Sequence, residues 1–254
     1  MSNPAAVCAL LAAFLATTRP AAIVLTDPCP MDELSAESLL KELRAVDTER
    51  ARRAADPALQ ARVHALKAWQ QRRFANTYAD LLAHPRYEAA TRFFLQELYG
   101  PGDYRQRDAQ FARVVPTLTR LFPAEVVDTV AKLARLHALS EHLDTRMAEH
   151  MPSTDITLAD YAIAWRACGE PASRQQQIDL TMAVGESLDR LTRKPLLRQT
   201  LKLMRGPAQM AGLGALQHFL ETGFDTFRAM RGATEFLATV KQREEALARE
   251  LFSA

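Results

Sequence analysis

The spacing of the apolar residues is the feature that most constrains how this chain can fold. From Ser35 onward, apolar side chains recur every three or four residues, and no segment shows the strict alternation of a half-buried β-strand. The clearest example follows Pro123, where Val126, Val130 and Leu133 form one stripe. Such spacing places side chains on one face of an α-helix. The sequence therefore predicts an all-α fold, a single bundle of roughly eight to ten helices with no substantial sheet.

Signals for helix starts agree with this prediction. Asp56 precedes Pro57 and can accept hydrogen bonds from the first turn of a long helix. Thr157 and Asp160 have the spacing of a capping box, which predicts a helix that continues to Cys168. Proline is tolerated in a first turn because its missing N–H would have no partner there. The prolines that fit such a position are Pro57, Pro85, Pro123, Pro171, Pro195 and Pro207.

The composition limits the class of protein. Of 254 residues, 48% are hydrophobic and 24% are charged, as in an ordinary globular protein. The formal net charge of +2 is too small to indicate an obligate polyanionic partner. Cys8, Cys29 and Cys168 are far apart and form no CxxC pair, which argues against a disulfide framework or a thiolate zinc site. We expect residues 31–254 to form one helical domain in a reducing cytoplasm.

Residues 1–30 are interpreted as an apolar, irregular extension of that domain. The run AAVCALLAAFLA begins at Ala5, has no basic residue before it and is too short to span a bilayer. We expect a cytoplasmic protein, with secretion through this segment as the alternative. A second alternative is that translation starts at Met31 rather than Met1, since Met31 directly precedes the first apolar stripe.

The segment FFLQELYGPGDYRQRD, residues 93–108, is predicted to be a corner between two helices. Gly100 can end a helix in a left-handed conformation, and Pro101 prevents its continuation. Asp103 and Gln106 match the first and fourth positions of a capping box. A phosphate-binding loop is the alternative, because a glycine-rich turn before a helix can bind anions. Against it, Asp103 would place negative charge at that helix start, and no GK[ST] motif follows.

The same corner holds candidate ligand-binding residues. An arginine here could hold a carboxylate or phosphate in a bidentate geometry, with a tyrosine hydroxyl as a further donor. The alternative is an ion pair that only fixes the corner. The candidates are Tyr99, Arg105, Arg107 and Asp108.

The second set of candidates interrupts the apolar stripe of the central helix. His137, Glu141 and Asp144 follow Val130 and Leu133 at helical spacing. One histidine and two carboxylates on one face could bind a metal or support general acid–base catalysis. Equally, they could form a buried network with arginines from neighbouring helices. The Glu-x-x-His motif of di-iron bundles and the HExxH motif are both absent, so we assign no metal and predict no particular cofactor.

Residues 190–205, RLTRKPLLRQTLKLMR, form a basic stretch. It begins with Arg190, ends with Arg205 and contains six cationic residues and no carboxylate. Contact with nucleic acid or an anionic surface is conceivable. The stretch lacks aromatic residues for base stacking, and no nucleic-acid-binding motif is present. A solvated basic face is the simpler interpretation.

Two segments carry a resemblance to a family. FFLQELYGPGDYRQRD and MRGPAQMAGLGALQHFLETGF resemble segments of an uncharacterised proteobacterial all-helical family, a domain of unknown function. The resemblance covers most of the chain after about residue 65. It implies one helical unit and carries no catalytic residue over to this chain.

These observations leave several functions open. The leading hypothesis is a non-enzymatic helical protein that binds a protein partner, a second copy of itself or a small ligand between its helices. The alternative is an enzyme or cofactor-binding protein that uses His137, Glu141 and Asp144, with Tyr99 and Arg107 supplied by the corner. This alternative requires the corner and the central helix to meet around a pocket. Weak binding of nucleic acid through the basic stretch ranks third, and membrane contact is not expected outside the N-terminal extension.

Overall fold

The computed structural model describes residues 30–98, 104–121, 124–194 and 196–253. Within these ranges it consists of α-helices and one π-helical segment, with no β-strand, so the all-α prediction is confirmed. The elements in chain order are α2 (Pro30–Ala54), α3 (Pro57–Thr77), α4 (Ala79–Ala83), α5 (Glu88–Phe93), η1 (Phe94–Leu98), α6 (Arg105–Leu121), α7 (Ala124–Glu149), α8 (Leu158–Cys168), α9 (Pro171–Thr192), α10 (Leu197–Leu203), α11 (Arg205–Met210), α12 (Gly214–Ala229) and α13 (Thr234–Ser253).

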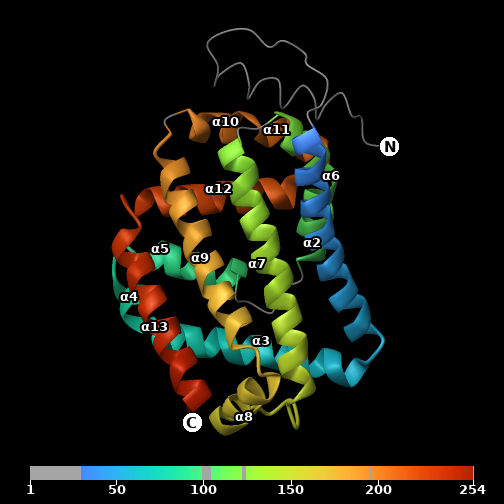
Figure 1. Cartoon of the computed structure of the whole chain (residues 1–254). Coiled ribbons are helices and arrows are strands. Elements are labelled where there is room, and N and C mark those ends of the chain that lie inside the picture. The colour runs from blue at the N-terminus through green and yellow to red at the C-terminus, as the bar shows by residue number, and fades with distance from the viewer. Residues whose placement is uncertain (1–29, 99–103, 122–123, 195, 254) are drawn as a thin grey trace.

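Four long helices form a layer through the molecule. Figure 1 shows α2, α7, α9 and α13 running side by side in that order, and each packs against the next. Two further helices cross the layer: α3 near the end where α8 lies, and α12 near the end where α10 and α11 lie. Helix α6 packs between α2 and α12. The central helix α7 therefore contacts α2, α3, α8 and α9, which makes it the structural centre of the fold.

Local sequence signals account for several helix ends. The Asp56 carboxylate accepts hydrogen bonds from the backbone N–H groups of Ala58 and Leu59, both at 3.0 Å, and starts α3. Thr157 and Asp160 form the expected capping box at the start of α8. Gly169 ends α8 with φ of 65°, a left-handed conformation that favours glycine.

The proline prediction holds only in part. Pro57 and Pro171 are the first residues of α3 and α9. Pro207 is the third residue of α11, and Pro85 lies in a turn before α5. Pro116 lies inside α6, where it removes one backbone hydrogen bond. The packing of α6 against α2 and α12 offsets this loss. Pro123, Pro195 and the capping residue Asp103 lie outside the described residues.

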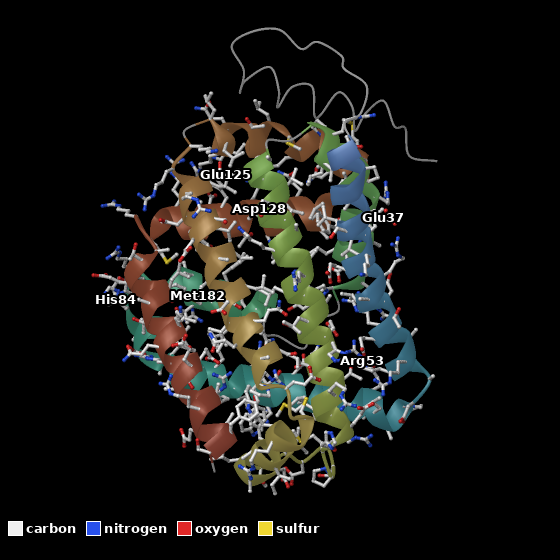
Figure 2. The ribbon with its side chains drawn as sticks, viewed as in Figure 1. Glu37, Arg53, His84, Glu125, Asp128 and Met182 are labelled. Atoms are coloured by element: carbon white, nitrogen blue, oxygen red, sulfur yellow. The ribbon has the colours of Figure 1, made fainter. Side chains whose placement is uncertain are left out.

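The core consists of separate hydrophobic clusters. An aromatic cluster joins α3 and α5 to α9, α12 and α13, and includes Phe74, Phe227 and Phe236. A second cluster gathers around Trp165 of α8, and a third joins α2, α6 and α7. Figure 2 shows Met182, a member of the aromatic cluster, between α9 and α13. Polar side chains of α3, α7 and α9 converge in the region between these clusters.

The charged side chains Glu37 and Asp128 are exposed, as Figure 2 illustrates. None of the described helices combines the length and the apolarity that a membrane span requires.

Candidate functional site

A cavity of about 190 Å³ lies where the hydrophobic clusters meet. Each of the three clusters described above contributes to its wall: Met182 and Val240 from the aromatic cluster, Tyr161 from the second, and Leu43 and Ala134 from the third. The volume is that of about six water molecules, and a dry cavity of similar size can hold a benzene-sized molecule. The fold therefore leaves space for a small ligand between its helices.

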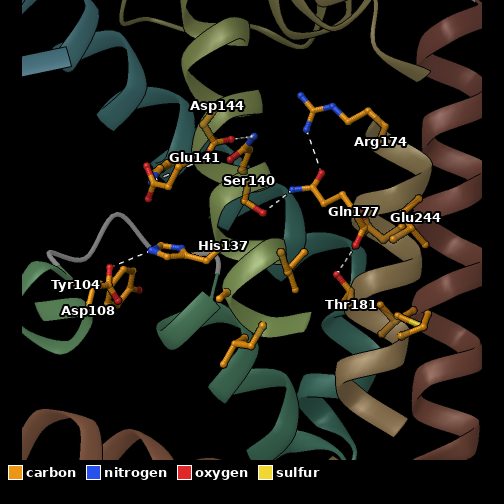
Figure 3. Close-up of a pocket in the computed structure, with 18 of the residues that line it drawn as sticks. Tyr104, Asp108, His137, Ser140, Glu141, Asp144, Arg174, Gln177, Thr181 and Glu244 are labelled. Atoms are coloured by element: carbon orange, nitrogen blue, oxygen red, sulfur yellow. Dashed lines mark hydrogen bonds and ion pairs between the residues drawn. The ribbon is translucent and has the colours of Figure 1, made fainter. Parts of the chain in front are cut away.

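Polar side chains enter this space from both sides of α7. In Figure 3, Tyr104, Asp108 and His137 gather on one side, and Ser140, Glu141 and Asp144 lie in the middle. Arg174, Gln177, Thr181 and Glu244 lie on the other side. Aliphatic and aromatic residues complete the wall, among them Leu133, Leu136, Phe219 and Leu220. A largely apolar wall with a few converging polar groups is typical of small-molecule sites.

The corner and the central helix meet at His137. Its Nε2 lies 2.9 Å from Oδ2 of Asp108, and the same oxygen accepts a hydrogen bond from Arg50 at 2.7 Å. Burial alone would raise the pKa of Asp108. The hydrogen bond and charge of His137, the hydrogen bond of Arg50 and the charge of Arg107 outweigh burial and lower that pKa to about 2. The two sets of sequence candidates therefore share one contact, across 29 positions of the chain.

Glu141 is held by two cations. Arg53 of α2 donates to its Oε2 at 2.6 Å, and Lys67 of α3 donates to its Oε1 at 2.7 Å. Burial opposes ionisation of Glu141, but the charges of Lys67 and Arg53 lower its pKa to about 2. Arg53 also donates to the Thr145 hydroxyl at 3.1 Å. Glu141 thus matches the buried-network interpretation, since both carboxylate oxygens already join α7 to α2 and α3.

Asp144 is in a different electrostatic state from Glu141. Its Oδ1 accepts a hydrogen bond from Gln70 at 3.2 Å, and Lys67 lies 3.8 Å from its Oδ2. Burial is the main reason that the pKa of Asp144 is raised, and the negative charge of Glu141 raises it further. The charge of Lys67 only partly compensates. The two carboxylates share one lysine, and Glu141 is the one held in the charged form.

The remaining corner candidates separate in space. Arg107 lies between two rings, with its guanidinium carbon 4.3 Å from the Tyr104 centroid and 4.5 Å from the Phe219 centroid. Arg107 lines the cavity, whereas Arg105 is exposed and does not. Tyr99 lies outside the described residues. The structure therefore brings Arg107 and Asp108 together with His137, Glu141 and Asp144, and leaves Arg105 apart.

Several cavity residues were not predicted from the sequence. Lys67, Gln70 and Arg73 come from α3, Arg174 and Gln177 from α9, and Glu244 from α13. Arg73 pairs with Glu244 at 2.6 Å across 171 positions of the chain. No local pattern marks such a pair, because each residue alone reads as part of an ordinary polar helix face.

Arg174 differs from the others because it is a buried cation whose contacts are with uncharged groups. It is 5% exposed, and its guanidinium donates to Gln177 at 3.2 Å and contacts the Met147 sulfur at 3.4 Å. The guanidinium carbon lies 4.0 Å from the ring centroid of Trp165. Within the described ranges, no carboxylate oxygen lies within 4.0 Å of it.

The basic stretch is largely neutralised by acidic side chains from elsewhere. Arg198 pairs with Asp225 at 2.6 Å, and Arg205 pairs with Glu221 at 2.6 Å. Further pairs join Arg190 and Lys194 to Glu125, and Arg193 to Asp189. Each of these five cations therefore has an acidic partner among the described residues.

Two more findings bear on identity. In the part of the chain that the structure describes, no group of three or more His, Cys, Asp or Glu residues has a metal-binding arrangement. The chain matches one family model over residues 49–254, described as Domain of unknown function (DUF8198). The chain belongs to this family. No curated protein and no solved structure matches it. Every cavity-lining residue except Leu43 lies within the DUF8198 domain, so the family match includes the site.

Proposed function

We propose that this protein binds a small organic molecule in the cavity between α3, α6, α7, α8, α9, α12 and α13. The observation that carries the proposal is the cavity itself, where polar groups from distant parts of the chain converge within a largely apolar wall. Packed helical cores leave few voids of this size.

A small ligand fits the molecule better than a protein partner. Met230, whose flexible side chain could otherwise make adaptable contacts with a partner, is buried in the aromatic cluster. The large exposed apolar side chains are distributed over α8, α10, α11 and α12, and they include Leu158, Ile163, Leu203 and Met210. Single exposed apolar residues are normal on a protein surface and do not define a partner site.

The first experiment fills the cavity with a larger side chain. Ile178 of α9 lines the cavity and is half-buried, so Ile178→Trp should occupy part of the space. The matched control is Ile163→Trp on α8, where the residue is 56% exposed and does not line the cavity. The probes are small alcohols, carboxamides and carboxylates with phenyl or short alkyl bodies. Binding is measured by ligand-observed NMR and by the shift in Tm.

We expect at least one probe to bind the unaltered protein and the Ile163→Trp variant equally, and to bind Ile178→Trp at least about tenfold more weakly, a loss of about 1.4 kcal/mol. Native mass spectrometry of the purified protein should also detect a retained molecule whose signal Ile178→Trp abolishes. If no probe binds, or if both tryptophan variants bind alike, the cavity is not a binding site.

An acid–base enzyme is the second candidate function. The contact that favours it is the 2.9 Å hydrogen bond between His137 and Asp108, because a carboxylate that orients a cavity-lining imidazole is a common arrangement in general-base catalysis. The test is mass spectrometry of each bound probe over time, with the unaltered protein and His137→Asn. Conversion that His137→Asn abolishes while binding persists would support an enzyme, and unchanged probes in both would leave ligand binding alone.

A further inference from the structure

We infer that the ligand of the cavity is an organic carboxylate whose negative group is bound by Arg174, with the indole N–H of Trp165 as a second donor. This inference rests on the proposed function, since it names the chemistry of the molecule that the cavity takes.

The first step concerns the charge of Arg174. A buried ion normally has a partner of opposite charge, because transfer from water into a protein interior is costly. The partners that the structure gives Arg174 are the Gln177 amide oxygen, the Met147 sulfur and the Trp165 ring. None of them carries a negative charge. A guanidinium has five N–H donors, so donors remain for an incoming group.

The second step concerns Trp165, which lines the same cavity and is 8% exposed. Its indole Nε1 is buried, and no hydrogen-bond acceptor for it lies among the residues that the structure describes. An unsatisfied buried N–H is uncommon and calls for an explanation. Because the Arg174 guanidinium stacks 4.0 Å from the Trp165 ring centroid, the two donor groups are neighbours in the wall. A single carboxylate can accept hydrogen bonds from both.

The third step concerns the protein's own carboxylates, which are directed elsewhere. Glu141 is bound by Arg53 and Lys67, and Glu244 is bound by Arg73. Asp144 is the alternative counterion to consider, because the charge of Arg174 does lower its pKa. Burial nevertheless raises the pKa of Asp144 overall, and its contacts are to Gln70 and Lys67. Lys67, Arg73 and Arg107 each have a carboxylate within 4.0 Å, so Arg174 is, among the described cations of the wall, the one that a ligand can neutralise.

The fourth step concerns the rest of the ligand. Around Arg174 and Trp165 the cavity wall is aliphatic and aromatic, with Tyr161 of α8, Ile178 of α9 and Leu247 of α13 among its residues. A volume of about 190 Å³ admits a body of the size of a phenyl ring or a short alkyl chain beside the carboxylate. The ligand class is thus a small monocarboxylate with an apolar body.

The experiment compares each carboxylate with its neutral carboxamide of nearly the same shape. The pairs are benzoate and benzamide, phenylacetate and phenylacetamide, and hexanoate and hexanamide. Binding to the full chain is measured by isothermal titration calorimetry. We expect at least one carboxylate to bind about ten- to a hundredfold more tightly than its amide, as charge-assisted hydrogen bonds require.

Variants of Arg174 then identify the group responsible. Arg174→Met keeps the length of the side chain and should reduce carboxylate affinity to that of the amide. Arg174→Lys keeps the charge and should retain a smaller preference for the carboxylate. Trp165→Phe keeps the ring and should weaken carboxylate binding by about tenfold, and it decides the matter if Arg174→Met does not fold. The control is Arg166→Met, because Arg166 contacts the Leu251 carbonyl and does not line the cavity.

These experiments distinguish failure of the carboxylate inference from failure of the proposed function. If carboxamides bind as tightly as carboxylates, and Ile178→Trp still blocks both, the cavity binds ligands but water satisfies Arg174, and the inference is wrong. The same conclusion follows if Arg174→Met keeps the preference for carboxylates. If no member of any pair binds, the inference fails, and the proposed function fails with it only if none of the alcohols binds either.

Discussion

At the scale of single residues, the polar interior of this protein contains ionisable groups that are well paired and others that are incompletely paired. Glu141 and Asp108 are paired with cations and have pKa values of about 2. Asp144 and Arg174 are buried with weaker compensation. Paired groups of the first kind hold helices together, whereas incompletely paired groups are typical of sites. This difference separates a structural network from a binding surface within one cavity.

Glu141 gives a prediction about pH. Its folded pKa is depressed from 4.5 to about 2, so its contribution to stability is fully present above about pH 4.5 and is lost as the pH falls towards 2. A difference of this size corresponds to roughly 3 kcal/mol. Glu141→Gln should therefore lower the free energy of unfolding by about that amount at pH 7 and by much less near pH 2. Urea denaturation of both proteins across this range measures it, and a constant difference would contradict the pairing.

Lys67 gives a second prediction at this scale. It lies 2.7 Å from Glu141 and 3.8 Å from Asp144, so its removal leaves two buried carboxylates with Arg53 as the remaining close cation. Lys67→Met should lower the free energy of unfolding by roughly 3–5 kcal/mol. Adding Asp144→Asn should restore part of the loss, because the amide needs no cation. Denaturation of the single and double variants tests the coupling, and purely additive losses would show that Lys67 does not serve both carboxylates.

At the scale of elements, the close approach of α9 and α13 fixes one wall of the cavity. A Cβ atom at Gly185 of α9 would lie 2.5 Å from Cδ2 of Leu237 on α13. Both helices contribute to the cavity wall, through Arg174, Gln177 and Glu244. Glycine at this position therefore sets how closely the two helices can pack.

This contact predicts the effect of a larger residue. Gly185→Val should lower the free energy of unfolding by about 1–3 kcal/mol, because overpacking displaces Leu237 or separates the helices. Leu237→Ala lowers stability by itself because Leu237 is buried, but Gly185→Val should cost less in that background since the obstructing methyl groups are gone. A double-mutant cycle in urea measures the coupling. Gly206→Val is the control for backbone effects, since no heavy atom outside its immediate neighbours lies within 4 Å of a Cβ atom there.

At the scale of the whole molecule, α2 completes the fold although its first part precedes the family match at residue 49. Leu39, Leu43 and Val46 are buried, with exposures of 1%, 7% and 1%. The first two pack in the third cluster against α6 and α7, and Leu43 lines the cavity. The family match therefore begins within a helix that the core needs.

Removal of residues 1–48 tests this dependence. Burial of each aliphatic side chain contributes about 1.5–3 kcal/mol, so loss of the three should lower the free energy of unfolding by about 5 kcal/mol or more. The shortened chain should also bind the probes more weakly, because Leu43 is absent from the wall. Urea denaturation against the full chain gives the first quantity and calorimetry the second. Equal stability of the two chains would mean that α2 contributes little to the core.

The sequence alone was sufficient for the fold class and for individual helices. Apolar spacing predicted α7, and the capping residues Asp56 and Thr157 start α3 and α8 as expected. These predictions succeed because helix periodicity and capping depend on residues within a few positions of one another. His137 was also visible as a polar interruption of an apolar stripe, and Asp108 as a charged residue of the predicted corner, although nothing local could distinguish a site from a network.

Tertiary structure decided which of these residues belong together. Arg53 and Lys67 reach Glu141 across 88 and 74 positions, and Arg73 reaches Glu244 across 171. Arg174 looks like any surface arginine in the sequence, but α8 and α9 bury it against Trp165. Burial and ion pairing arise only when distant helices pack, so the repeating pattern determined the elements and their packing created the cavity.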